Sequence, residues 1–137
     1  MALVNERNRR IVEEFRANAG MVGGHFEGAS LLILHTTGRR TGREHVTPLV
    51  YLPDGERYVV FGSKGGAPTH PEWFLNLTTN PDATVEVGAR TIRVRATEVT
   101  GPERDELYAR QVERWEVFRD YPSKTSRVIP AVALDPV

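Results

Sequence analysis

The chain has 137 residues, of which 39% are hydrophobic and 26% charged, the composition of one water-soluble globular domain spanning residues 1–137. Its 18 Lys and Arg residues balance 18 Asp and Glu residues, and a formal net charge of zero argues against a nucleic-acid or general membrane binder, whose whole surface would be basic. No cysteine is present, which excludes disulfides and thiolate zinc sites and fits a cytoplasmic setting.

The first 20 residues predict an amphipathic N-terminal helix that closes one side of the fold. Its apolar residues recur at helical spacing between charges, at Leu3, Val4, Ile11, Val12 and Phe15. The stretch is too charged for a signal peptide. Because the polar face is rich in arginine, the alternative is a peripheral contact with the inner face of the cell membrane or with a partner protein.

The rest of the chain predicts an antiparallel sheet with helices between its strands. Strands are expected at residues 30–37, 45–52, 57–62, 83–87, 90–99 and 128–134. Helices are expected at 72–80 and 102–115. We expect the first three strands to form a meander. No parallel strand–helix–strand unit is visible, so the fold class is α+β, with a small barrel or a strongly curled sheet.

The turn after the first strand carries almost only positive charge. Arg39, Arg40 and Arg43 lie on or just after it, and Glu44 is its one acid. The planar guanidinium group donates two parallel hydrogen bonds, which suits phosphate and carboxylate groups. The sequence therefore predicts an anion contact, and a solvated basic hairpin is the alternative.

A second anion contact is expected in the loop from Ser63 to Gly66. Ser63 offers a hydroxyl group, Lys64 offers a charge, and the two glycines permit close approach of the backbone. The spacing is not that of a P-loop. In a meander, the third strand ends near the arginine turn, so we expect the two anion contacts to converge.

Residues for acid–base or metal chemistry are not apparent. The four histidines show no metal-ligand spacing, so no metal is expected at His25, His35, His45 and His70. Ser63 has no base near it in the sequence, and no nucleophile elbow is present. An anion site without its own acid–base set favours a cofactor that supplies the chemistry.

Three longer stretches together resemble one known family. They read LLILHTTGRRTGREHVTPLVYL, VVFGSKGGAPTHPEWFLNLTTNPDATVEVG and YPSKTSRVIPAVAL. The combination is similar to the deazaflavin (F420)-dependent nitroreductases, and the resemblance runs from the first helix to Leu134. It implies an antiparallel split β-barrel of about six strands with N-terminal, middle and C-terminal helices. It also implies coenzyme F420, an 8-hydroxy-5-deazaflavin with a phosphate and an oligoglutamate tail.

The resemblance assigns roles to residues of this chain. The expected contacts of the cofactor's phosphate and tail are Arg39, Arg40, Thr41, Gly42, Arg43, His45 and Lys64. Those of its ring and ribityl chain are Thr47, Pro48, Gly62, Ser63 and Trp73. The acceptor is expected to face Trp115, Phe118 and Tyr121, with a catalytic hydrogen bond from Ser63 or Tyr121. Departures from the family pattern are His35, His45, Gly62 and Phe118.

The function that the resemblance implies is transfer of a hydride from reduced deazaflavin to a small-molecule acceptor. Quinones, enones and nitroaromatics are the expected acceptors. Two alternatives stay open: an FMN-dependent reductase of the same fold, and a non-catalytic protein that binds or carries deazaflavin. The chain is expected to be a monomer or a homodimer.

Overall fold

The computed structural model describes residues 5–26 and 28–137. Its helices are α1 (Glu6–Ala17), α2 (Glu72–Thr79) and α3 (Gly101–Arg114). Its strands are β1 (Leu31–Thr37), β2 (Glu44–Val50), β3 (Leu52–Asp54), β4 (Arg57–Phe61), β5 (Asp82–Val87), β6 (Arg90–Val99) and β7 (Ala131–Pro136). Short 3₁₀ turns cover Gly24–Phe26, Lys64–Gly66, Glu116–Arg119 and Tyr121–Lys124. The first four residues of the expected N-terminal helix lie outside the described part.

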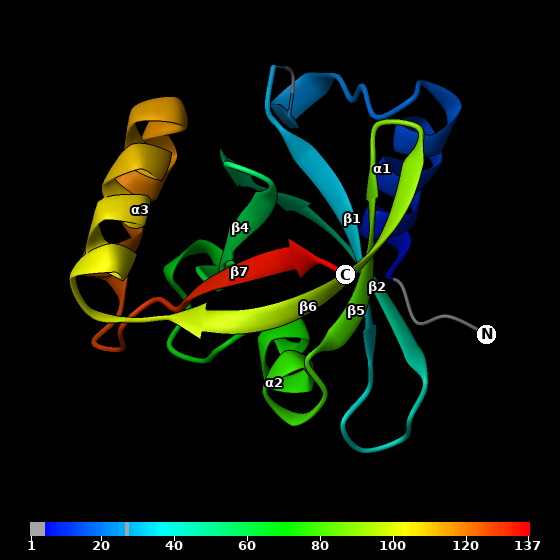
Figure 1. Cartoon of the computed structure of the whole chain (residues 1–137). Coiled ribbons are helices and arrows are strands. Elements are labelled where there is room, and N and C mark those ends of the chain that lie inside the picture. The colour runs from blue at the N-terminus through cyan, green and yellow to red at the C-terminus, as the bar shows by residue number, and fades with distance from the viewer. Residues whose placement is uncertain (1–4, 27) are drawn as a thin grey trace.

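The seven strands form one curled antiparallel sheet in the order β2-β1-β5-β6-β7-β4-β3. Its two edges, β2 and β3, are consecutive in the chain and are separated only by Tyr51. The sheet must therefore curl back on itself, and it forms a split barrel. Helices α1 and α3 lie on opposite sides of this sheet, and α2 lies at its lower end (Figure 1). The expected α+β class with a curled antiparallel sheet is confirmed.

The expected meander of three strands is wrong. The chain bends at Tyr51, whose backbone N–H donates to the oxygen of Ser30, and this bend divides the expected strand 45–52 into β2 and β3. Strand β2 pairs with β1, whereas β3 pairs with β4 and β4 with β7. The last strand begins at Ala131 and not at 128, because Pro130 has no N–H to donate to a ladder.

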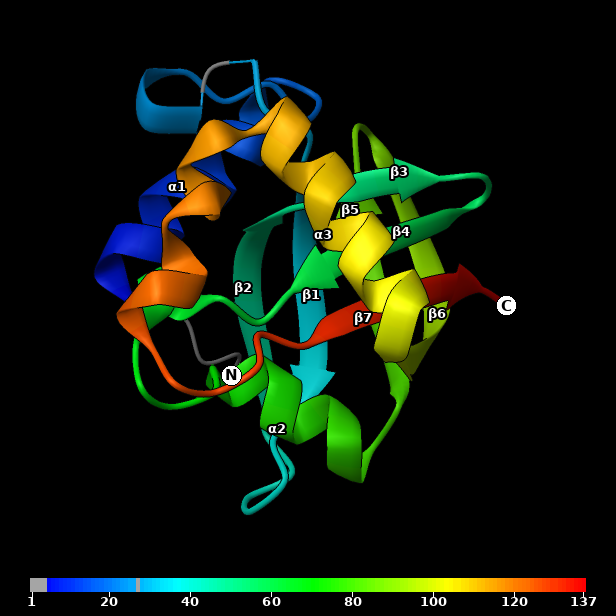
Figure 2. The same cartoon turned by 90° about the vertical axis from the view of Figure 1, so that its left-hand side faces the viewer.

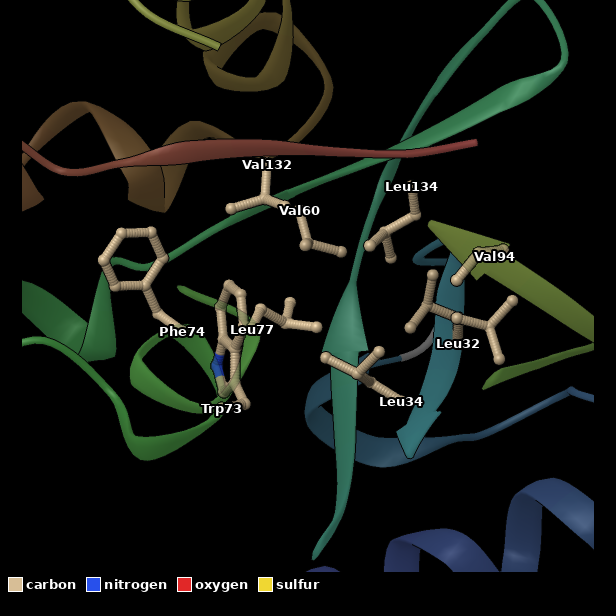
Figure 3. Packing of buried hydrophobic residues seen from close by; sticks show 10 residues of the cluster. Leu32, Leu34, Val60, Trp73, Phe74, Leu77, Val94, Val132 and Leu134 are labelled. Atoms are coloured by element: carbon tan, nitrogen blue, oxygen red, sulfur yellow. The ribbon is translucent and has the colours of Figure 1, made fainter. Parts of the chain in front are cut away.

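Helix α2 fills the inside of the curl. Pro71 precedes it and Asn80 follows it, and its apolar residues Trp73, Phe74 and Leu77 are each 5–6% exposed. They pack against valines and leucines from five strands, among them Leu34, Val60, Val94, Val132 and Leu134 (Figure 3). Burial of such side chains contributes about 1.5–3 kcal/mol each, so α2 is fixed firmly against the sheet.

Helices α1 and α3 each cover part of the outside of the sheet (Figure 2). Val12 and Phe15 of α1 pack on β1 and β2, and Leu107 and Tyr108 of α3 pack on β4 and β7. The arginines of α1 are partly engaged within the molecule, since the Arg16 side chain donates to both carboxylate oxygens of Glu86 at 2.9 and 2.7 Å. No helix in residues 5–26 and 28–137 is long and apolar enough to cross a membrane. The expected peripheral membrane contact stays a prediction.

Candidate active site

A cavity of about 490 Å³ lies along the free edge of β2 and continues to the end of β4. We call it the main cavity. Most of its walls come from five segments that are distant in sequence, namely the start of α1, strand β2, the chain from Phe61 to Gly65, the start of α2, and the segment after α3. The residues lining it are Asn5, Arg7, Asn8, Phe26, Thr47, Pro48, Leu49, Val50, Phe61, Ser63, Lys64, Gly65, Pro71, Glu72, Trp73, Trp115, Phe118 and Tyr121. Its volume is in the range of small-molecule sites.

Strand β2 supplies one wall because it is an edge strand. One side of it pairs with β1, where Thr47 lies opposite Leu34 and Pro48 opposite Ile33. Proline cannot donate to a ladder, and it is tolerated on an edge strand. Thr47 and Pro48 both line the main cavity, where a flat ligand could lie along the unpaired edge.

The loop Ser63–Ala67, which we call the Lys64 loop, brings backbone close to the cavity. Three consecutive residues have positive φ angles, 47° at Lys64, 63° at Gly65 and 83° at Gly66. For lysine this conformation is strained, by about 1–2 kcal/mol. The Nζ atom of Lys64 donates to the Thr69 hydroxyl at 3.2 Å, and its side chain is exposed at the cavity.

The arginine turn lines a second, smaller cavity of about 160 Å³, the arginine pocket. Its lining residues are Gly38, Arg39, Arg40, Thr41, His45, Glu72 and Asn76. Helix α2 holds the turn in place, since the buried Asn76 accepts from the Arg39 backbone N–H at 3.1 Å and donates to Thr36 at 3.2 Å. Glu72 lines both the arginine pocket and the main cavity, so the two cavities adjoin.

The arginines of this turn do not form one open fork. The Arg39 guanidinium donates to the Glu72 carboxylate, and this hydrogen bond holds the pKa of Glu72 below its usual value. Arg43 lines neither the main cavity nor the arginine pocket. Gly42 lines a different cavity together with His35 and Glu44. The structure therefore brings Arg39, Arg40, Thr41 and His45 together and leaves Gly42 and Arg43 outside both cavities.

Trp115, Phe118 and Tyr121 form an aromatic wall of the main cavity. Helix α3 ends at Arg114, and Phe118 and Tyr121 lie in successive 3₁₀ turns, whose period of three residues matches their spacing. Phe118 is 7% exposed and packs edge-on against Phe61 and Tyr121 at 6.1 and 5.1 Å between ring centroids. It belongs to the core as well as to the wall.

Tyr121 carries the phenol group of this wall. It is half-buried, and burial raises the pKa of its hydroxyl group. The group therefore stays protonated at neutral pH and can donate a hydrogen bond. Ser63, 9% exposed, places a second hydroxyl group at the cavity.

Gly62 does not line the main cavity. A Cβ atom there would lie 2.8 Å from Pro130 Cγ and 3.4 Å from Pro71 Cδ, so the residue is packed between two prolines behind the wall. Trp73 does line the cavity, although most of its ring is in the core.

Sequence reasoning missed several residues of the wall. Arg7 and Asn8 reach the cavity from the first turn of α1, and Glu72 separates it from the arginine pocket. Glu72 could have been identified from the sequence, because it stands between Pro71 and Trp73. No local pattern in the sequence marks Arg7, because only the folded position of α1 brings it to the cavity.

Residues 7–136 match the family described as F420H(2)-dependent quinone reductase. The chain belongs to this family. It is similar to an F420H(2)-dependent quinone reductase of Mycobacterium tuberculosis, with 38% identity over 129 residues that cover 88% of this chain and 83% of that protein. A solved F420-H2 dependent reductase is 31% identical, with a TM-score of 0.72, covering 82% of this chain and all of the other. A chain described as a domain-swapped dimer is 29% identical, with a TM-score of 0.73 and 95% of each chain covered.

As an F420H(2)-dependent quinone reductase family member, the chain is an oxidoreductase, and its cofactor is coenzyme F420. The cavities fit that group on chemical grounds. The main cavity offers apolar and aromatic walls for a flat ring, and the adjoining arginine pocket offers cationic side chains for a phosphate and carboxylates. Within the described residues no cluster of side chains could hold a metal ion.

Proposed function

We propose that this chain reduces quinones with reduced coenzyme F420, and that both molecules bind in the main cavity. Enones and nitroaromatics are further proposed acceptors. When bound, the reduced deazaflavin supplies a hydride from C5 to an electron-poor acceptor. The observation that carries the proposal is a single cavity with an aromatic wall that adjoins, at Glu72, a pocket lined by Arg39 and Arg40.

We infer that the cofactor's ring lies along Thr47 and Pro48, between the edge of β2 and the Lys64 loop. Support comes from Thr47, Pro48 and Ser63, which all line the main cavity. Trp73 would form the floor near the ring. The phosphate and tail are assigned to Lys64 and to the four residues of the arginine turn that line the arginine pocket, namely Arg39, Arg40, Thr41 and His45. The Arg39 guanidinium group already donates to Glu72. An anion that binds there must therefore share the guanidinium group with the Glu72 carboxylate or displace that carboxylate.

The aromatic wall is assigned to the acceptor. Trp115 and Phe118 would exclude water from the reacting atoms, which strengthens electrostatic interactions inside the site. The hydroxyl group of Tyr121 or Ser63 would donate to the acceptor oxygen on which negative charge develops. A protonated phenol suits this role, and the raised pKa of Tyr121 supports it.

Anaerobic turnover of F420H2 with menadione tests the proposed function. We expect the protein to catalyse the return of the absorbance of oxidised F420, at a rate that depends on menadione concentration. A heat-denatured sample and a reaction without menadione serve as controls. Binding of the cofactor without menadione-dependent turnover would favour a carrier, and turnover with reduced FMN alone would favour the FMN alternative.

Replacing Lys64 with asparagine should weaken F420 binding. The loss of a charge-assisted contact costs about 1.5–3 kcal/mol, or roughly tenfold to a hundredfold in Kd. Asparagine tolerates the positive φ of 47° at this position, so the change removes the charge with little strain in the backbone.

Fluorescence titration at low and high salt measures this effect. The difference between wild type and the Lys64→Asn variant should shrink in high salt, because ion contacts are screened. Arg119→Gln is the matched control, since Arg119 is exposed and, among the described residues, forms an ion pair only with the exposed Glu116 at 3.5 Å. A Lys64→Asn variant that binds F420 like wild type at low salt would show that this lysine is merely solvated.

A further inference from the structure

Arg127 holds the back of the Lys64 loop with four hydrogen bonds. Its Nε donates to the oxygen of Ala67 at 2.9 Å, and its Nη2 to the oxygen of Ser63 at 2.9 Å. Its Nη1 donates to the oxygen of Gly62 at 2.9 Å and to Nδ1 of His70 at 3.0 Å. Because a guanidinium group has only donors, Nδ1 of His70 must be the acceptor. One side chain thus fixes a segment that lies about sixty residues earlier in the chain.

The surroundings of Arg127 are unusual for a cation. Burial lowers the pKa of its guanidinium group, and no carboxylate among the described residues offsets this effect. Arginine nevertheless stays charged in proteins. Its charge is balanced by the dipoles of three backbone carbonyl groups. Arg127 does not line the main cavity, so nothing in the proposed reaction uses it directly.

The bonded carbonyl groups fix the direction of the neighbouring amides. In a trans peptide the N–H points away from the C=O, and the described residues contain no cis peptide. With the oxygens of Gly62 and Ser63 turned to Arg127, the N–H groups of Ser63 and Lys64 must point to the opposite side. Ser63 and Lys64 line the main cavity, and Arg127 lies behind them.

The backbone at this point has the shape of an anion-binding concavity. Ser63 is right-handed, with φ −72° and ψ −41°, and Lys64 is left-handed, with φ 47°. This right-then-left sequence makes successive N–H groups converge on one point, which forms a nest for a negatively charged oxygen. Within the described residues, neither the Ser63 N–H nor the Lys64 N–H donates a hydrogen bond.

We propose that Arg127 is a positioning residue for the cofactor. It holds the carbonyl groups of Gly62 and Ser63 away from the main cavity, and thereby presents the N–H groups of Ser63 and Lys64 to an anionic oxygen of the cofactor. Without it, carbonyl oxygens could turn toward the same anion and repel it. The proposal rests on the proposed function, since it requires the cofactor to bind in the main cavity.

Two substitutions of Arg127 and one control test the proposal. Arg127→Met removes all four hydrogen bonds, and Arg127→Lys keeps the charge without the planar fork. Arg119→Met removes an exposed arginine from the same C-terminal segment. Each variant is titrated with F420 and with the deazaflavin that lacks the phosphate and the tail, at a temperature where its circular dichroism shows it fully folded. Steady-state kinetics with menadione then separates KM for F420H2 from kcat.

We expect Arg127→Met to raise the Kd and the KM for F420 roughly tenfold or more, with kcat at saturation close to wild type. Arg127→Lys should recover part of the affinity, and Arg119→Met should bind like wild type. A loss confined to F420 would place an oxygen of the phosphate or of the tail in the nest, and an equal loss with the compound that lacks both would place an oxygen of the ring there. Either result supports the role of Arg127.

Folded Arg127 variants with a wild-type Kd for both compounds would overturn the proposal, even if their Tm were lower. If Arg127→Met does not fold, Arg127→Lys decides between the same two outcomes. Failure of the proposed function would look different, because wild-type protein itself would then either not bind F420 or bind it without menadione-dependent turnover.

Discussion

Replacing Gly66 with alanine is expected to lower the free energy of unfolding by about 2–5 kcal/mol and to weaken F420 binding. Gly66 has a φ of 83°, and a Cβ atom there would lie 2.7 Å from Lys124 Cβ and 3.1 Å from the oxygen of Tyr121. The Lys64 loop would have to move away from the turn that carries Tyr121. Both the proposed cofactor side and the proposed acceptor side of the main cavity would be disturbed.

Gly65→Ala is the matched control for this variant. Gly65 also has a positive φ, 63°, but no atom lies within 4 Å of its Cβ position. The free energy of unfolding of the Gly65→Ala variant should fall by only about 1–2 kcal/mol, which is the cost of the left-handed conformation for alanine. Urea denaturation of both variants measures the difference. Equal losses would mean that the contact between the Lys64 loop and the turn Tyr121–Lys124 is looser than the packing indicates.

Replacing Tyr121 with phenylalanine is expected to lower kcat/KM for menadione about tenfold to a hundredfold, without a change in F420 affinity. One hydrogen bond to a developing oxyanion contributes roughly 1–3 kcal/mol to the barrier. The substitution keeps the ring, and therefore its edge-on contact with Phe118 at 5.1 Å. Only the hydroxyl group is lost.

Tyr58→Phe is the control for this comparison. Tyr58 lies on β4 and packs against Tyr51 with 5.4 Å between the ring centroids. It does not line the main cavity. Its variant should show wild-type kinetics with menadione. If Tyr121→Phe also does so, the phenol has no catalytic role, and the aromatic wall serves only for packing.

Much of the fold could be predicted from local patterns. The boundaries of α2 follow from Pro71 and from Asn80-Pro81, and the hairpin of β5 and β6 follows from alternation around Gly88. The bend at Tyr51 could not be predicted, because the position itself is neither glycine nor proline and the apolar run from Leu49 to Leu52 continues through it. The curl of the whole sheet produces this bend. Because of this bend, β2 and β3 pair with different strands, and the sheet is a split barrel and not a meander.

The chemistry of the candidate site was only partly visible in the sequence. The glycines and the lysine of the Lys64 loop are visible in the sequence, and they indicate that the backbone there can closely approach an anion. The partners of charged residues depend on tertiary contacts, so neither the ion pair of Arg39 with Glu72 nor the contacts of Arg127 leaves a local pattern. The assignment of these residues to the cofactor stays a prediction until it is measured.

A side-by-side titration of the wild-type protein with F420 and FMN shows whether the arginine pocket selects the tailed cofactor. Both ligands have a flat ring and one phosphate, and only F420 adds a tail of carboxylates for the arginine pocket. We predict that F420 binds more tightly than FMN, and that added salt reduces this preference, because screening acts on the tail contacts. Equal or tighter binding of FMN at low salt would show that the arginine pocket does not bind the tail.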